Sequence, residues 1–101
     1  MSKITESARD EICEIQIPGA CNGNPKTTVW CHSNKSCHGK GVGKKSLDLF
    51  GAYGCSACHD VYDRRRRPPP GMSYNAVEDC FFYGHARSVV KLVEKGLVVC
   101  R

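Results

Sequence analysis

The short motif Cys55-Ser56-Ala57-Cys58-His59 places two thiols and an imidazole next to one another in the chain. A Cys-x-x-Cys pair brings two thiolates to one tetrahedral ion, and Zn²⁺ prefers four ligands of this kind. Cys13 and Cys21 flank a Pro-Gly turn that could bring them together as a second pair. The sequence therefore predicts a structural zinc site made of Cys13, Cys21, Cys55 and Cys58.

Other interpretations of the cysteines stay open at this point. Reduced cysteines also occur as small core hydrophobes, and Cys-x-x-Cys can be a redox pair, although the βαβ pattern expected around one is missing. A rival zinc set would combine Cys31 and Cys37 with Cys55 and Cys58. A secreted, disulfide-stapled domain is a further alternative, but residues 1–10 are polar and contain no apolar signal segment.

Two histidines add a second kind of chemistry. His59 follows a zinc ligand directly, so its ring should point away from the zinc and into the groove between its helix and the preceding strands. His32 ends a strand-like run and could face the same groove. One histidine can activate water while another helps hold a divalent ion on a scissile phosphate. This pair predicts a metal-dependent nuclease.

The basic residues indicate a polyanionic partner. The chain has 15 Lys and Arg against 10 Asp and Glu, a formal charge of +5. The run Arg64-Arg65-Arg66-Arg67 directly follows the predicted metal helix, and guanidinium groups bind phosphates with little dependence on sequence. With Lys40, Lys44 and Lys45 these residues could follow a DNA backbone. No segment resembles a base-reading helix, so we predict little direct sequence readout.

The elements that must position these side chains belong to a small α+β fold. Hydrophobic periodicity and turn residues predict helices over residues 4–14, 56–66 and 74–95, and strands over 13–17, 27–31 and 97–100. Residues 33–46 read as a glycine-rich loop, and residues 47–53 as a short strand or turn. Ser73 should cap the last helix and Gly96 should end it. Its buried face should hold Val77, Cys80, Phe81, Val89, Leu92 and Val93.

Length and composition limit the protein class. A chain of 101 residues fits one domain, residues 1–101. No apolar stretch approaches the roughly twenty residues that a membrane-spanning helix needs. Without a visible export signal, thiols kept reduced in a bacterial cytoplasm are the expected state of the cysteines.

The motifs in this order resemble the HNH, or His-Me finger, endonucleases. The chain is similar in particular to the small prophage-encoded nucleases of the YbcO type. The resemblance rests on Cys13-x-x-x-Ile17-Pro18-Gly19-x-Cys21-Asn22-Gly23-Asn24-Pro25, His32, Asp48-Leu49 and Cys55-Ser56-Ala57-Cys58-His59-Asp60-x-x-Asp63-Arg64-Arg65. It implies a zinc-stapled ββα-metal core, flanked by an N-terminal helix and a longer C-terminal helix.

The resemblance also implies roles for individual residues. His32 would be the general base, and His59 would bind the catalytic ion, Mg²⁺ or another divalent metal. Asp48 lies nearest the place of the middle Asn of the motif and could orient His32 or bind the metal. Asp60 and Asp63 are alternative sources of a carboxylate. The implied activity is hydrolysis of DNA phosphodiester bonds.

A function from another class stays open. A zinc module that binds nucleic acid or a partner protein without catalysis needs the four cysteines and the basic run, but it needs neither His32 nor His59. Many nucleases of the resembling kind work as dimers, and the apolar segment 97–99 could pair with a second copy of the chain. A homodimer is therefore also an expectation.

Overall fold

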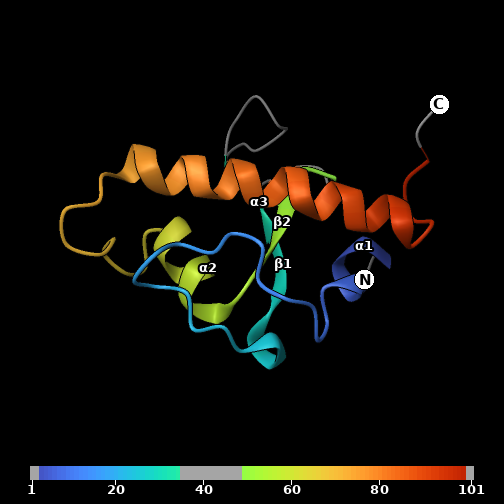
Figure 1. Cartoon of the computed structure of the whole chain (residues 1–101), viewed down its shortest axis with the longest axis horizontal. Coiled ribbons are helices and arrows are strands. Elements are labelled where there is room, and N and C mark those ends of the chain that lie inside the picture. Colours follow the sequence, from blue (N-terminus) through green and yellow to red (C-terminus); the bar gives the residue numbers. More distant parts are fainter. Residues whose placement is uncertain (1–2, 35–48, 100–101) are drawn as a thin grey trace.

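A long C-terminal helix runs along the whole molecule and carries the other elements on one side (Figure 1). The computed structural model describes residues 3–34 and 49–99. Its elements are α1 (Lys3–Ser7), the 3-10 turn η1 (Pro25–Thr27), β1 (Val29–His32), β2 (Gly51–Gly54), α2 (Ser56–Tyr62) and α3 (Tyr74–Glu94). The α+β class is confirmed. The strand expected over 27–31 is found at Val29–His32, and of the strand or turn expected over 47–53 a strand is found at Gly51–Gly54.

The sheet is a pair of antiparallel strands, β1 and β2. Trp30 pairs with Tyr53, and their rings meet edge to face with centroids 5.3 Å apart. Gly51 lies beside this pair, and a Cβ built there would come within 2.5 Å of Nε1 of Trp30. The aromatic pair therefore requires glycine at the first position of β2.

Helix α3 covers the open edge of β2. The hydroxyl oxygen of Ser88 accepts a hydrogen bond from the amide of Tyr53 at 2.9 Å, and Nδ1 of His85 donates to the carbonyl of Gly51 at 2.6 Å. The amides of Glu14 and Ile15 both donate to the carbonyl of Tyr53. These contacts satisfy backbone groups that an exposed strand edge would leave unpaired.

Both ends of α3 lie where the sequence predicts them, whereas only part of the predicted buried face is buried. The hydroxyl of Ser73 caps the helix by accepting from the amide of Ala76, and Gly96 follows the last turn with φ 75°. Of the predicted face Val77, Phe81 and Leu92 are buried, whereas Cys80, Val89 and Val93 are only partly buried. The remaining buried positions are Gly84 and Ser88, where the N-terminal segment and β2 approach the helix most closely.

Two predicted elements near the N-terminus are wrong in extent or type. The helix expected over 4–14 ends at Ser7, because Asp10 has φ 62°, outside the range of a right-handed helix. Residues 13–17 do not form a strand, since Gln16 has φ 51° and bends the chain there. The bend keeps Ile15 and Ile17 buried and brings the amide of Gln16 to the sulfur of Cys13.

Two predictions further along the chain are also corrected. The helix expected to reach residue 66 ends at Tyr62, well before the prolines, because Arg64 adopts the left-handed conformation with φ 64° and the amide of Arg65 bonds back to the carbonyl of Asp60. Residues 97–99 form no strand. Leu97 and Val98 instead pack against the cluster around Trp30, and Val99 is exposed.

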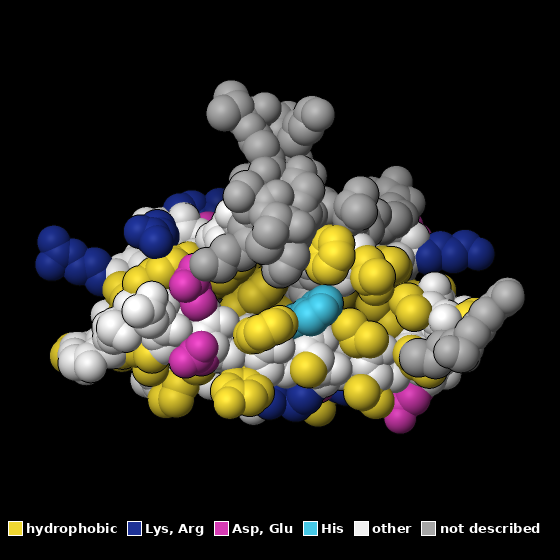
Figure 2. All heavy atoms as spheres, turned by 90° about the horizontal axis from the view of Figure 1, so that it is seen from above, with side chains coloured by type: hydrophobic (Ala, Val, Ile, Leu, Met, Phe, Trp, Pro, Cys, Tyr) yellow, Lys and Arg dark blue, Asp and Glu magenta, His cyan; other side chains and the backbone are white. Residues whose placement is uncertain are grey.

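The outer face of α3 carries several exposed apolar side chains among polar and charged ones. Phe82, Tyr83 and Val90 are exposed there, and Figure 2 shows apolar side chains gathered along this face.

Within residues 3–34 and 49–99, no helix is both long enough and apolar enough to cross a membrane.

Candidate metal centre and flanking histidines

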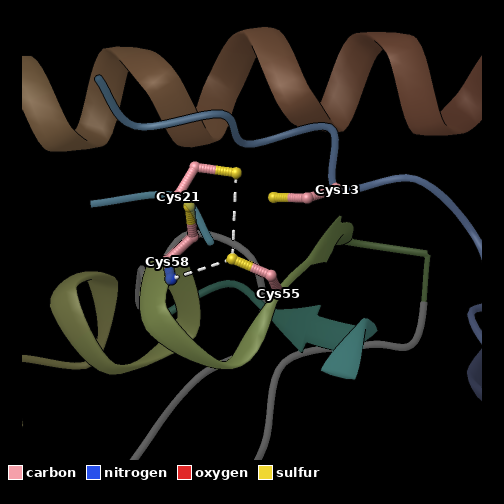
Figure 3. Close-up of side chains that lie close together, drawn as sticks. All are labelled: Cys13, Cys21, Cys55 and Cys58. Carbon is pink, nitrogen blue, oxygen red and sulfur yellow. Dashed lines mark hydrogen bonds between the residues drawn. The ribbon is translucent and has the colours of Figure 1, made fainter. Parts of the chain in front are cut away.

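The four predicted zinc ligands come together in the structure. The sulfur atoms of Cys13, Cys21, Cys55 and Cys58 all lie within 4.8 Å of one another (Figure 3). The sulfurs of Cys21 and Cys55 are 3.9 Å apart. A tetrahedral ion with Zn–S bonds of about 2.3 Å needs sulfur atoms about 3.8 Å apart. The cluster therefore has the composition and nearly the size of a four-cysteine zinc site.

Backbone amides point at the sulfurs. The amides of Gln16, Ile17 and Asn22 lie 3.4–3.5 Å from the sulfurs of Cys13, Cys58 and Cys55, in that order. The amide of Cys58 also donates to the sulfur of Cys55, which thereby caps the start of α2. Such bonds stabilise thiolate charge, so the surroundings favour the form of cysteine that binds metal.

Packing the thiols together separates their pKa values. A hydrogen bond with Cys58 lowers the pKa of Cys13 to about 5, while the same contact raises the pKa of Cys58. Burial raises the pKa of Cys21 to about 11. At neutral pH one thiol of the cluster thus ionises easily and others resist. Because a metal binds thiolates, its binding must release protons from this cluster.

The loop around Cys21 is fixed by turn chemistry. Gly19 and Gly23 have φ 80° and 65°, as the Pro-Gly and Asn-Gly steps predict. The Asn22 side chain accepts from the amide of Asn24 at 2.8 Å and donates to the hydroxyl of Ser56 at 3.1 Å. This last bond joins the loop to the first turn of α2. It therefore helps to hold Cys21 close to Cys55 and Cys58.

The rival zinc set is not the one that converges. Cys31 is fully buried in the same core cluster as Cys55 and Cys58 but does not belong to the four-sulfur group, and burial raises the pKa of its thiol. Cys37 lies outside the described residues. Cys80 packs, partly buried, against the same core. Cys31 therefore serves as a core residue next to the cluster.

His32 is the last residue of β1 and is half-buried. Side chains alternate along a strand, so His32 shares a face with Trp30, while Cys31 on the other face packs towards the cysteine cluster. Within residues 3–34 and 49–99, neither His32 nor His59 belongs to a group of three ligand atoms within 4.8 Å of one another. A groove shared by the two histidines stays a prediction.

His59 lies on the half-exposed face of α2 and contacts two charged side chains. Its Nε2 is 2.9 Å from Oδ2 of Asp63, one turn later. Its Nδ1 is 3.4 Å from Nη2 of Arg65. The Arg65 guanidinium also reaches Oδ1 of Asp60 at 3.2 Å and Oδ2 of Asp63 at 3.4 Å. These contacts follow from the left-handed turn at Arg64, which sends Arg65 back towards α2.

The arginine run surrounds an open cavity of about 330 Å³. Within residues 3–34 and 49–99 it is lined by Arg64 to Arg67 with Val61, Pro68 and Tyr74, a set that contains no carboxylate. Arg64 lies 3.8 Å from the centroid of the Tyr74 ring, a cation–π contact that fixes one wall. The cavity is suited to an anion.

The remaining predicted site residues, Lys40, Lys44, Lys45 and Asp48, lie outside the described residues.

Comparison with known proteins gives the family. A family model described as "Putative nuclease YbcO" matches residues 2–97, nearly the whole chain. The chain belongs to the YbcO family.

Relatives in the YbcO family come from a bacterium and a phage. A protein from Escherichia coli (strain K12) named "Putative nuclease YbcO" is 36% identical over 100 residues, covering 97% of this chain and 98% of its own. One of the same name from Enterobacteria phage 82 matches equally. A solved structure of a "putative bacteriophage protein" from E. coli str. K-12 substr. MG1655 shares 35% identity with a TM-score of 0.74, covering 91% of this chain and 98% of that one.

Two residues of this YbcO-family chain have roles that sequence reasoning missed. His85 holds the carbonyl of Gly51, the strand partner of His32. Arg87 holds the N-terminal segment through both the carboxylate and the carbonyl oxygen of Glu14. Helix periodicity gives no sign of either role, because the partners lie 34 and 73 residues away in the sequence.

Proposed function

We propose that this YbcO-family protein is a divalent-metal-dependent endonuclease of the HNH, or His-Me finger, type that hydrolyses DNA phosphodiester bonds. The observation that carries the proposal is the order of elements around the cysteine cluster. Two antiparallel strands run directly into α2, β1 ends at His32, and α2 carries His59. This order of strand, strand and helix supports the proposal of a ββα-metal core.

In this proposal the four cysteines hold a structural Zn²⁺. The ion joins the loop of Cys13 and Cys21 to the start of α2, and so fixes the helix that carries His59 against the strands. A closed site with four thiolates has no open position for substrate. The zinc therefore stabilises the fold, and the reaction takes place at the histidines.

Each histidine has a separate task in the reaction. His32 accepts the proton of the attacking water as general base. His59 would hold a divalent ion, Mg²⁺ in the simplest case, and such an ion would supply the Lewis acidity that polarises the phosphate and stabilises the leaving 3′-oxygen. Asp48, as predicted from the sequence, orients His32 or shares the metal. Arg64 to Arg67, with Lys44 and Lys45, hold the DNA backbone through phosphate contacts.

Nicking of supercoiled plasmid by zinc-loaded protein in Mg²⁺ or Mn²⁺ tests the proposal. His32→Ala should lose about a hundredfold or more of the rate, as expected for removal of a general base. Glu94→Gln, an exposed change on α3, is the control. Equal rates for His32→Ala and wild type would overturn the assigned mechanism.

The same experiment separates the other function class. A zinc module without catalytic activity would contain one zinc per chain and bind DNA, but it would not nick plasmid with any divalent metal.

The expected homodimer stays a prediction. The exposed residues Phe82, Tyr83 and Val90 are a surface that a second copy of the chain could contact. Sedimentation of the zinc-loaded protein measures the oligomeric state directly.

A further inference from the structure

The contacts of His59 define which nitrogen can bind a metal. A guanidinium only donates hydrogen bonds, so Nδ1 of His59 accepts from Arg65. In the neutral ring the proton is then on Nε2, where it faces Asp63 at 2.9 Å. The lone pair of Nδ1 is therefore available to a cation only when Arg65 leaves.

The Arg65 guanidinium lies against groups that are themselves metal ligands. It contacts Nδ1 of His59 and carboxylate oxygens of Asp60 and Asp63 at 3.2–3.4 Å. Imidazole nitrogen together with carboxylate oxygen is a donor set that Mn²⁺ and related divalent ions accept. An internal cation thus already occupies a place with the charge and donor atoms of a metal site.

The spacing of His59 and Asp63 fits a site with open positions. Nη2 of Arg65 lies 3.4 Å from both Nδ1 of His59 and Oδ2 of Asp63, so a cation in its place would meet both ligand atoms. Side-chain exposure is 28% for His59 and 30% for Asp63, so water and substrate can reach both. Mg²⁺ and Mn²⁺ are commonly bound by one or two protein ligands, with water and substrate phosphate completing the shell.

The arginine cavity supplies a reason for Arg65 to move. Arg65 lines it together with Arg64, Arg66 and Arg67, and among the described residues its lining brings four guanidinium groups and no carboxylate. A phosphate bound there would attract the Arg65 guanidinium, because a charge-assisted bond to phosphate can replace its bonds to two aspartates. Arg65 belongs to both sites, so an anion in one changes the cation affinity of the other.

We propose that Asp63 and His59 together form the divalent-cation site, and that Arg65 blocks this site until a DNA phosphate in the arginine cavity draws its guanidinium away. The proposal rests on the proposed function for the identity of the substrate. It adds Asp63 as a ligand and Arg65 as a residue that couples DNA binding to metal binding. Coupling of this kind is reciprocal, so the metal also tightens DNA binding.

Mn²⁺ binding to the zinc-loaded protein, followed by electron paramagnetic resonance, tests this directly. A cluster of four thiolates selects Zn²⁺ over Mn²⁺, so the signal reports the second site. Without DNA, Arg65→Gln should bind Mn²⁺ at least about fivefold more tightly than wild type. Asp63→Asn should bind it about tenfold or more weakly. Arg9→Gln removes the same charge from an exposed side chain outside the arginine cavity and should leave the affinity unchanged.

A short DNA duplex with phosphorothioate linkages provides the second measurement. It should tighten Mn²⁺ binding to wild type by about fivefold or more and have little effect on Arg65→Gln, in which the block is already removed. Equal Mn²⁺ affinity of Arg65→Gln and Arg9→Gln in the absence of DNA would overturn the coupling. Wild-type affinity in Asp63→Asn would overturn the ligand.

Plasmid nicking distinguishes failure of this inference from failure of the proposed function. If Mn²⁺ binds as expected but no variant or wild type cuts DNA, the proposed activity is wrong and the cation site stands. If wild type cuts and Asp63→Asn cuts at the same rate with the same Mn²⁺ affinity, the cation site is wrong and the activity stands.

Discussion

The imidazole Nδ1 of His85 lies 2.6 Å from the carbonyl oxygen of Gly51. Gly51 pairs with His32 across the sheet, so a residue of α3 holds the strand end opposite the proposed general base. Strand ends fray unless their backbone groups find partners. His85 therefore determines how firmly the site end of the hairpin is held.

His85→Ala should destabilise the protein by about 1 kcal/mol, the usual net value of one hydrogen bond. It should also raise the hydrogen-exchange rates of the β2 amides, measured by NMR. His85→Gln, which keeps an N–H donor, should recover part of the protection. Exchange rates in His85→Ala equal to those of wild type would contradict this role.

Zinc affinity should rise with pH across the neutral range. The pKa of Cys21 is raised to about 11, so its proton is still bound at neutral pH and must leave when metal binds. The pKa of Cys13 is lowered to about 5, so above that pH its thiol contributes no proton. Each released proton gives about a tenfold gain in apparent affinity per pH unit. Competition with a chelator at pH values one unit apart measures the slope, and a flat profile would contradict it.

Gly84→Ala should destabilise the protein although it places alanine in a helix. An added Cβ would lie 2.8 Å from the carbonyl oxygen of Glu14 and 2.9 Å from Cα of Ile15, both backbone atoms that cannot move independently. We expect a loss of about 2 kcal/mol, because overpacking outweighs the helix propensity gained. Tyr83→Ala, at the neighbouring exposed position, should be nearly neutral. Thermal unfolding of the two variants compares them.

Glu14→Gln should loosen the N-terminal segment from α3. The carboxylate of Glu14 is almost buried and lies 2.9 Å from Nζ of Lys91 and 3.2 Å from Nε of Arg87. Its neutralisation removes the charge from both ion pairs and leaves Lys91 with Glu11 and Arg87 with the Glu14 carbonyl, at an expected cost of about 1–3 kcal/mol. Glu94→Gln on the exposed face should cost much less. Urea unfolding measures the stability of both variants. Equal stabilities of Glu14→Gln and Glu94→Gln would contradict this role of the Glu14 carboxylate.

Arg66→Gln and Arg67→Gln should weaken DNA binding mainly through its salt dependence. Each phosphate contact that is lost should reduce the slope of log affinity against log salt by about 1, with little change between DNA sequences. Arg9→Gln, an exposed arginine two residues after the end of α1, is the matched control. Fluorescence anisotropy across a salt series measures the slopes. Equal slopes for all three variants would place the DNA elsewhere.

The features that sequence predicts well are those whose cause is local. The Pro-Gly and Asn-Gly steps produce the positive φ angles of Gly19 and Gly23, and so the loop that brings Cys13 and Cys21 together. Ser73 and Gly96 delimit α3 for equally local reasons. The prediction that four cysteines form one cluster followed from thiol chemistry combined with these turns.

The errors arise where a residue adopts a conformation that its type does not favour. Asp10, Gln16 and Arg64 have positive φ without being glycine, and each ends or bends an element that periodicity extends further. The contact of Arg65 with His59 depends on one of these turns. Ser88 and Gly84 are buried because β2 and the N-terminal segment approach them, which no pattern within the helix reveals.

The cysteine cluster also orders the events of folding. Cys55 and Cys58 can bind an ion as soon as the first turn of α2 exists, but Cys21 lies 34 residues from Cys55 and can join only after the chain between them has closed. Closing a longer loop costs little more free energy than closing a shorter one, yet contacts between distant residues form slowly. A half-loaded species held by the Cys-x-x-Cys pair is therefore the expected folding intermediate. Capture of the second pair would be the step that commits the hairpin to its native arrangement.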